Sequence, residues 1–535
     1  MSRYDYVIVG GGTAGSILAN RLTADGRFRV LLLEAGGTPK SPWIKIPAGF
    51  SKLLTNTTYN WCFESKPEAT TNERVIAIPR GKGLGGSTLI NGMIYVRGQP
   101  EDYDSWLDDG AIGWGWRDVE PYFGKLENFA EGGPSRGKSG PMYLTRVSER
   151  FAISDAFLKA AAEDGQPYND DYNGPQQEGV GYYQVTQRDG RRWSVVDGYL
   201  RPALARSNLT VLTGCRVHRL ELDGNRCTGV TYERAGKSVT VGAEQEVVLC
   251  AGAIQNPQLL ELSGIGNPDI LAKAGIKSKV SLAGVGENYI DHYATRMNWR
   301  VRNTVTLNEM SRGWRLGQEL LKYIAGRKGI LTLGTGLVHA FIKTRHTLSR
   351  PDVQFFFVHA SYSNAATRIL DRKPGMTIGV TQLRPTSTGS IHVVNGNVET
   401  PPSIKPNMLS TEEDCRVLVE GMKAARKIVE QPALRDFVDH EMAPGKEVTT
   451  DEQWLAFARQ NGQTIYHPIG TCKMGTDETA VVSPDLQVKG VKGLSVADAS
   501  VMPSMVSGNT QGAVMMVAEK AADIIIERAV VEKCS

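Results

Sequence analysis

The sequence predicts an α/β fold that contains a Rossmann-like dinucleotide-binding unit. An apolar run at residues 6–9 leads into a glycine-rich turn at 10–15, and apolar residues at helical spacing follow from residue 16. The chain has 535 residues, which is enough for a large core and for two or more domains. Its 58 glycines fall in clusters, where a chain bends tightly or approaches a ligand. Together these features are typical of a multidomain α/β enzyme.

Composition excludes several classes of partner. The 61 Lys and Arg residues nearly balance the 57 Asp and Glu residues, and the charges are interspersed along the chain. This pattern predicts no nucleic-acid binding. No apolar run approaches the roughly 18 residues that suggest a membrane span. Peripheral attachment to a membrane stays open.

Cysteine usage indicates a reducing compartment. The seven cysteines are an odd number, and they form no CxxC pair that would suggest a disulfide frame or a zinc site. The N-terminus runs directly into an apolar strand with no basic leader, so we expect the mature chain to begin near Met1. We therefore expect a cytoplasmic protein, with attachment to the inner face of the membrane as the alternative.

The first glycine-rich turn has the spacing of a pyrophosphate-binding loop. Gly10 permits a tight turn, Gly12 lets the backbone approach a pyrophosphate, and Gly15 lets the helix pack on the strand. A second strand over Arg29–Leu33 ends in Glu34, where a carboxylate accepts hydrogen bonds from an adenosine ribose. The motif alone does not separate NAD from FAD, but its place at the N-terminus resembles flavoproteins.

A second glycine-rich segment, Arg80–Met93, can press backbone amides against a phosphate or a flavin. With Tyr95, Gly98 and Asp104, it closely resembles the first signature of the glucose-methanol-choline (GMC) oxidoreductase family. Matching segments continue at Cys250–Pro257, Ser263–Gly266, Gly284–Asn288 with Asp291 and His292, Tyr466–Gly475, and Val496–Pro503. Asn256 stands where the family more often has Ser or Thr.

The resemblance implies FAD as the cofactor and assigns residues to it. It places Gly10, Gly12, Thr13, Ala14 and Gly15 at the pyrophosphate, Glu34 at the adenosine ribose, Val217 at the adenine, Gly86, Ser87, Asn91, Gly92 and Thr510 at the flavin end, and Asp498 near the ribityl phosphate. Some family members bind FAD covalently through a His just before the Asn of the first signature. Ile90 occupies that place here, so we expect non-covalent FAD.

The same resemblance points to His467 and Asn509 as the catalytic pair. Imidazole titrates near neutral pH and suits a general base, whereas the Asn509 amide can donate a hydrogen bond to a substrate oxygen. For His292 we expect a structural role beside the cofactor. The remaining histidines share no spacing that would assemble a metal site, so we expect no catalytic metal.

The cofactor segments lie at both ends and in the middle of the chain, which predicts a discontinuous FAD-binding domain over 1–145, 200–300 and 450–535. We assign 145–200 and 300–450 to an α+β substrate-binding domain with an antiparallel sheet. Strands are expected at 352–358, 376–383 and 390–394, and helices at 412–429 and from Thr510 to Ala522. That sheet can form a wall over the flavin.

We therefore expect FAD-dependent oxidation of an alcohol to an aldehyde, by proton abstraction at His467 and hydride transfer to flavin N5. A primary alcohol is favoured, a polyol or ether-alcohol comes next, and an aromatic alcohol stays open. The expected acceptor is a quinone or another carrier, because the chain is similar to the family's bacterial dehydrogenases. The alternatives are an oxygen-using oxidase, an FAD-containing hydroxynitrile lyase, and a non-catalytic flavoprotein.

Overall fold

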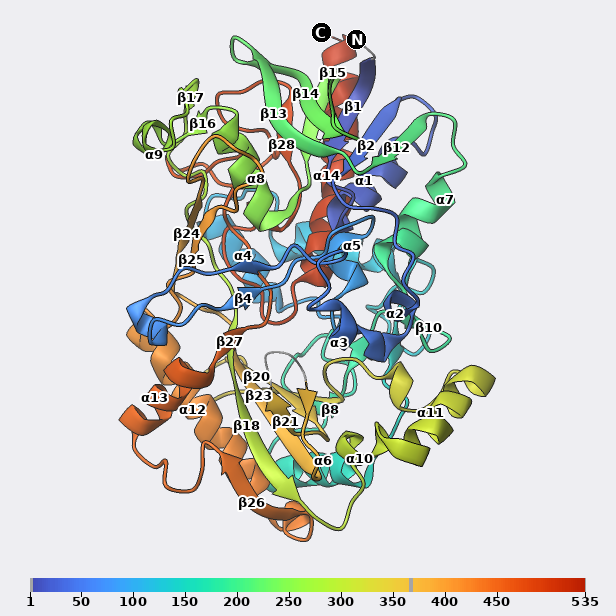
Figure 1. Cartoon of the computed structure of the whole chain (residues 1–535), viewed down its shortest axis with the longest axis vertical. Helices are drawn as coiled ribbons and strands as arrows, with labels where there is room; N and C mark the ends of the chain where they lie inside the picture. Colours follow the sequence, from blue (N-terminus) through green and yellow to red (C-terminus); the bar gives the residue numbers. More distant parts are fainter. Residues whose placement is uncertain (1–2, 365–368, 535) are drawn as a thin grey trace.

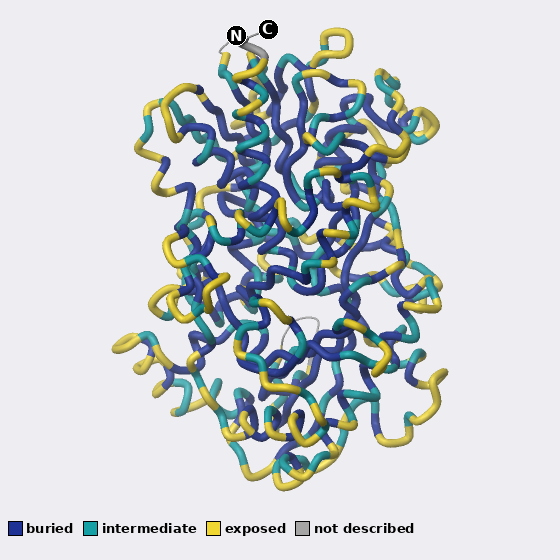
Figure 2. The backbone as a smooth tube through the Cα atoms, turned by 180° about the vertical axis from the view of Figure 1, so that it is seen from behind, coloured by how far each residue is buried: buried dark blue, intermediate teal, exposed yellow. Residues whose placement is uncertain are grey.

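A computed structural model describes residues 3–364 and 369–534, so Met1, the expected start of the mature chain, lies outside the described residues. The molecule is elongated, with one large sheet near the adjacent chain termini and a second toward the opposite end (Figure 1). Figure 2, seen from behind, shows buried chain running through the interior and exposed chain mainly at the outer loops. The fold is thus α/β with a second α+β region, as the sequence predicts.

The first sheet has parallel strands at its centre and an antiparallel extension. Its order is β12-β2-β1-β15-β14-β13, and β28 pairs in parallel with β15. Residues 6–9 and 30–33 pair in parallel as continuous apolar strands, as expected of a sheet buried on both faces. The strands are β1 Arg3–Val9, β2 Val30–Glu34, β12 Leu209–Thr213, β13 Arg216–Asp223, β14 Arg226–Arg234, β15 Lys237–Leu249 and β28 Leu494–Val496.

Helices from both ends of the chain pack beside this sheet. Helix α1, Thr13–Leu22, packs on α14, Gln511–Cys534, and α14 also contacts α5, Trp116–Leu126. Arg21 of α1 reaches the buried Glu519 of α14 at 2.6 Å. This part-buried pair joins the C-terminal helix to the last turn of α1, the helix that follows the glycine turn. Helix α14 is much longer than the helix predicted over Thr510–Ala522.

The second sheet is antiparallel throughout, with the order β26-β18-β23-β20-β19-β8, and β27 pairs with β18. Helix α12, Glu412–Val429, packs on β23 and has the bounds that the sequence predicts. Helix α6, Ala152–Glu163, packs against α12. The strands are β8 Gly179–Tyr182, β18 Tyr293–Val301, β19 Val338–Ile342, β20 Val353–Val358, β23 Gly375–Gln382, β26 Val438–Ala443 and β27 Gln463–Thr464.

The strand predicted over residues 390–394 forms only in part. Strand β24, Ser390–His392, pairs with β25, Ser403–Lys405, in a separate two-stranded sheet. The alternation of residues is the same for a strand in any sheet, so periodicity could not identify its partner.

Candidate active site

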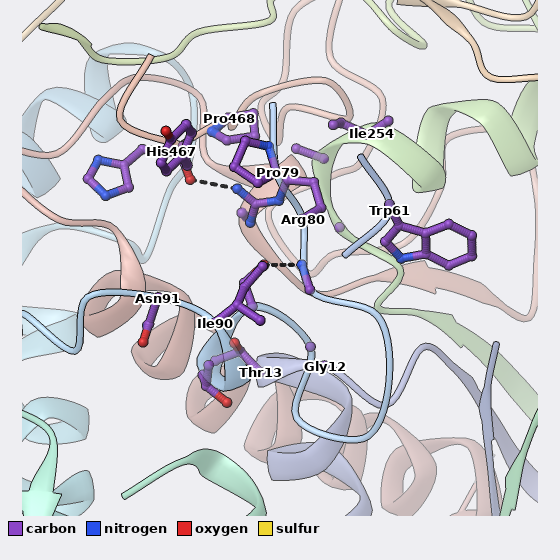
Figure 3. A pocket seen from close by; sticks show the side chains of 18 of the residues that line it. Gly12, Thr13, Trp61, Pro79, Arg80, Ile90, Asn91, Ile254, His467 and Pro468 are labelled. Atoms are coloured by element: carbon purple, nitrogen blue, oxygen red, sulfur yellow. Dashed lines mark hydrogen bonds between the residues drawn. The ribbon is translucent and has the colours of Figure 1, made fainter. Parts of the chain in front are cut away.

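A large cavity lies between the two sheets and joins the two glycine-rich segments to the second signature and the C-terminal segment. Figure 3 shows its labelled side chains converging from several separate segments of the chain. The cavity is lined by fourteen of the residues assigned from the sequence: Gly10, Gly12, Thr13, Ala14, Glu34, Gly86, Ser87, Asn91, Gly92, Val217, His467, Asp498, Asn509 and Thr510.

Gly15 does not line the cavity and acts in packing. A Cβ at Gly15 would stand 1.9 Å from the Gly10 carbonyl oxygen, so only glycine lets α1 lie this close to the turn. Gly10 itself has φ 105° in the left-handed region. At Gly12, by contrast, the nearest protein atom to an added Cβ is 3.9 Å away, and the residue faces the cavity.

Three helices begin at this cavity. They are α1 at Thr13, α8, Gly252–Leu262, at Gly252, and α14 at Gln511, and each of these residues lines it. The first amide N–H groups of a helix have no carbonyl acceptor within the helix, and the helix dipole adds positive potential at this end. Three such ends suit a ligand with a pyrophosphate and a ring system that becomes anionic on reduction.

Glu34 ties the two glycine-rich segments together. Its carboxylate accepts hydrogen bonds from the amides of Gly11 at 2.8 Å, Gly36 at 2.7 Å and Gly83 at 3.1 Å. Burial raises the pKa of Glu34 above its usual value, although these three donors favour the charged form. Three acceptor sites are used, so one stays available for a ribose hydroxyl.

Asp498, at the start of α8, accepts four hydrogen bonds within the protein. Its carboxylate accepts from the Gly252 amide at 2.6 Å, from Asn256 Nδ2 at 2.9 Å, and from both the amide and the hydroxyl of Ser500. Asn256 Oδ1 in turn accepts from the Ala251 amide at 2.9 Å. An amide at position 256 thus holds both Asp498 and the helix start, which explains how Asn replaces the usual Ser or Thr.

The residues of the second glycine-rich segment are held by a buried arginine that we did not predict from the sequence. Arg192 donates to Asn91 Oδ1 at 2.6 Å and to the carbonyl oxygens of Thr88 and Asn91. Asn91 Nδ2 donates to Gln511 Oε1, and Gln511 Nε2 is buried with no hydrogen-bond partner among the described residues. An orphaned donor in a cavity-lining residue fits a ligand acceptor such as a flavin carbonyl or ring nitrogen.

The side chains of His467 and Asn509, for which the sequence predicts catalytic roles, lie within hydrogen-bond distance of each other. Asn509 Nδ2 lies 3.2 Å from His467 Nε2. Behind His467, its Nδ1 faces His292 Nδ1 at 3.0 Å, and His292 Nε2 faces the Leu383 carbonyl oxygen at 2.9 Å. On the other side, Gln354 Nε2 lies 3.3 Å from Asn509 Oδ1.

One arrangement of protons satisfies all of these contacts together. A carbonyl oxygen only accepts, so His292 Nε2 carries a proton, and burial lowers the pKa of His292 to about 4, which keeps the ring neutral. His292 Nδ1 is therefore an acceptor, and His467 Nδ1 must donate to it. His467 Nε2 is left with a lone pair beside the Asn509 amide, which is the state that a general base requires.

A strained turn positions His467. Tyr466 has φ 73°, which is unusual for a bulky residue, and Arg80 donates to its carbonyl oxygen (Figure 3). Asp291 accepts from the His467 amide at 2.8 Å and from the Thr464 hydroxyl. Burial raises the pKa of Asp291 to about 6. The segment around Asp291 and His292 thus supports both the backbone and the ring of His467.

The second sheet covers the cavity. Ala294, Arg296, Phe356, Thr377 and Gly379 from neighbouring positions of β18, β20 and β23 line it. The second sheet therefore forms one wall of the cavity. Among the described residues, no group of three or more His, Cys, Asp or Glu side chains is arranged to hold a metal ion.

Testing the role of His292 requires variants that differ in whether they can accept a hydrogen bond. We expect His292→Leu to slow substrate oxidation on the order of tenfold or more, because His467 Nδ1 loses its acceptor and the reactive tautomer is no longer enforced. His292→Asn keeps an acceptor near the same place and should recover most of the rate. Rapid-reaction kinetics of flavin reduction checks this. Equal rates in the two variants would show that the ring only fills space.

Comparison with known proteins identifies the family of the chain. The GMC oxidoreductase family model matches residues 4–294 and 385–518. The chain is 40% identical to the mitochondrial choline dehydrogenase of Homo sapiens, over 98% of this chain and 89% of that protein. It is 38% identical to an alcohol dehydrogenase [acceptor] of Pseudomonas putida, over 98% and 96% of the two chains.

A solved structure shares the whole fold. It is a formate oxidase from Aspergillus oryzae, studied for the modification of its FAD, which superposes with a TM-score of 0.91 at 26% identity over 98% of each chain. Both parts of the family model match, and the relatives are matched over most of their length. This chain belongs to the GMC oxidoreductase family.

Proposed function

We propose that this enzyme oxidises an uncharged primary alcohol to the aldehyde, with His467 as the general base. As a GMC oxidoreductase, the chain is an FAD-dependent enzyme that acts on CH–OH donors. The observation that carries the finer proposal is the directed hydrogen-bond chain from Gln354 through Asn509, His467 and His292 to the Leu383 carbonyl. It leaves one unprotonated ring nitrogen beside an amide donor.

When bound, FAD supplies the hydride acceptor at N5 of its ring system. His467 Nε2 takes the hydroxyl proton of the alcohol, and Asn509 Nδ2 donates a hydrogen bond to the oxygen on which negative charge develops. The alcohol thus loses one proton and one hydride and leaves as the aldehyde. Burial, His292 and Arg80 hold the pKa of His467 well below 6.5, so the base is unprotonated at neutral pH.

The FAD fits without a covalent bond. Ile90 is buried and lines the cavity, and its hydrocarbon side chain has no nucleophilic atom that could attack a flavin. The glycine turn, the three helix starts and the orphaned Gln511 amide supply non-covalent contacts instead.

The charge of the lining favours a neutral substrate. Among the described residues that line the cavity, Glu34 and Asp498 provide the carboxylates, and backbone amides and side chains already bond to both. The covering sheet contributes the guanidinium of Arg296 and the ring of Phe356. Further aromatic faces in the lining come from Trp61, Phe63, Tyr362 and Tyr466. Aromatic faces can contact a quaternary ammonium group, but a buried cation also needs a counter-charge, and here both carboxylates are already hydrogen-bonded and an arginine stands at the wall.

A pair of equal-sized alcohols tests this preference. Choline and 3,3-dimethylbutan-1-ol have the same shape, but choline carries a positive charge. We expect the neutral alcohol to be oxidised with a kcat/KM at least about tenfold higher, because a buried cation without a counter-charge is unfavourable. Steady-state assays with an artificial electron acceptor measure the ratio. A higher kcat/KM for choline would refute the neutral-substrate proposal.

The electron acceptor is proposed to be a quinone or another carrier, and an alcohol oxidase that uses oxygen is the alternative. The similarity to an alcohol dehydrogenase [acceptor] supports the first reading. Reoxidation of the reduced protein by a quinone analogue or by air distinguishes the two, and a faster reaction with air would favour the oxidase.

A further inference from the structure

Helix α11, Gly313–Gly326, carries its apolar side chains on the outside of the molecule. Trp314 is 70% exposed, Leu321 67% and Ile324 71%. The residues that it buries are Glu319 and Tyr323. A helix on the surface of a globular protein normally buries its apolar stripe, so this arrangement is the reverse of the usual one.

The exposed residues form one continuous stripe. Positions 314, 321 and 324 are separated by seven and three residues, which places them on one side of a helix, and the 42% exposed Leu320 lies beside them. Figure 1 shows α11 projecting from the lower right edge of the molecule. Large exposed apolar patches on a protein surface usually mark a site of interaction.

The orientation of α11 is fixed by bonds on its inner side. Glu319 Oε2 accepts from the Ile330 amide at 3.0 Å, and Glu319 Oε1 accepts from Lys322 Nζ at 2.6 Å. The Tyr323 hydroxyl donates to the Gly190 carbonyl oxygen at 3.3 Å. Turning the stripe inward would break the bonds to Ile330 and Gly190, which lie outside the helix, so the apolar face is held outward.

Positive charge surrounds the stripe. Within residues 310–330 the only acidic side chain is the buried Glu319, and the cations are Arg312, Arg315, Lys322, Arg327 and Lys328. Arg315 also lies 3.5 Å from Glu309. Next to the C-terminal end of the helix, Arg327 lines a surface hollow together with Arg188, which pairs with Asp189, and Arg146, which pairs with Glu131 and Asp170. The face is therefore apolar at its centre and cationic at its rim.

We propose that α11 docks this enzyme on a lipid bilayer that contains anionic lipids. Trp314, Leu321 and Ile324 enter the boundary between headgroups and acyl chains, while the surrounding cations meet lipid phosphates. Tryptophan is well suited to this depth because its ring is apolar and its N–H is polar. A second copy of the chain fits less well, because two cationic rims would face each other.

The docking helix is linked to the flavin end of the cavity. The chain continues from α11 through the short helix η5, Ile330–Thr332, to Thr335, which lines the cavity. Thr335 packs so closely on Gly92 that a Cβ at Gly92 would stand 2.1 Å from its hydroxyl oxygen. Bilayer docking at α11 would thus hold the catalytic end of the enzyme near lipid-dissolved alcohols or quinones. The membrane inference itself does not depend on which alcohol is oxidised.

Docking of this kind is peripheral. Within the described ranges, no helix combines the length and the hydrophobicity that a bilayer crossing needs. Binding should therefore be reversible and weakened by salt, as expected for a shallow amphipathic helix with a cationic rim.

Flotation with vesicles tests the proposal on the holoenzyme. The probe is vesicles of phosphatidylcholine mixed with phosphatidylglycerol, compared with phosphatidylcholine alone. We expect the protein to float with the anionic vesicles, and the triple variant Trp314→Gln, Leu321→Gln, Ile324→Gln to bind them at least about tenfold more weakly. Glutamine keeps a high helix propensity, so α11 should remain folded.

Ile112→Gln is the matched control, because Ile112 is 70% exposed but lies between α4, Pro100–Asp108, and α5. It should bind vesicles as the wild type does. All variants should keep their flavin and their activity with a water-soluble dye, which separates bilayer docking from catalysis. Absence of wild-type flotation, or equal flotation of the triple variant, would overturn the proposal. Self-association that is lost in the triple variant, without vesicle binding, would instead identify a second copy as the partner.

Discussion

The variant His467→Ala should keep its FAD and lose alcohol oxidation by about a hundredfold or more. Removing the imidazole removes the base that accepts the hydroxyl proton, and general-base catalysis contributes about 10²–10⁴ in rate. The helix starts and the glycine turn do not involve His467, so the flavin content should stay near that of the wild type. Anaerobic rapid mixing with an alcohol measures the rate of flavin reduction directly.

His440→Ala provides the control, because His440 lies half-exposed at the edge strand β26 and pairs with Asp439. It should reduce its flavin at the wild-type rate. Wild-type rates in His467→Ala would remove the proposed base. A variant that had lost its flavin would show that His467 instead supports the fold of the cofactor site.

The variant Gly12→Val should fold but contain less than about a tenth of the wild-type flavin. An added Cβ at this position meets no protein atom closer than 3.9 Å, so the new side chain projects into the cavity at the start of α1. It would occupy the space where a pyrophosphate approaches the helix amides. The ratio of flavin to protein absorbance measures the loss, and the circular dichroism spectrum checks the fold.

Two other glycine variants make that result specific. Gly124→Ala lies inside α5, and an added methyl meets nothing within 4 Å, so both fold and flavin content should be unchanged. Gly15→Ala would push a methyl to 1.9 Å from the Gly10 carbonyl oxygen, so it should destabilise the protein itself. Full flavin content in Gly12→Val would show that the cofactor lies elsewhere.

Much of the fold is predictable from the sequence because it depends on local patterns. The bounds of α12 follow from its apolar spacing and its Thr411 N-cap, and β1, the glycine turn and α1 follow from one short segment. The pairing of β24 with β25 was not predictable, because alternation identifies a strand without identifying its neighbour. Likewise, periodicity groups the residues of α11 on one face but does not show that the face points outward.

The sequence predicts which residues line the cavity better than it predicts the hydrogen bonds that join them. Signature segments identify His467 and Asn509, whereas the relay through His292 and Gln354 depends on strands that are distant in the sequence. Arg192 was not predicted as a site residue. Two adjacent arginines normally indicate an exposed surface, and nothing in the sequence shows that the second one is buried against Asn91. Tertiary packing alone places these side chains together.

The central claim is best tested by anaerobic mixing of the purified protein with a panel of alcohols, while the oxidised flavin band at about 450 nm is followed. We expect uncharged primary alcohols to bleach the band, and a quinone analogue admitted afterwards to restore it. A protein whose flavin stayed oxidised with every alcohol would contradict alcohol oxidation. The same scaffold would then be better explained as a lyase or as a flavoprotein without redox activity.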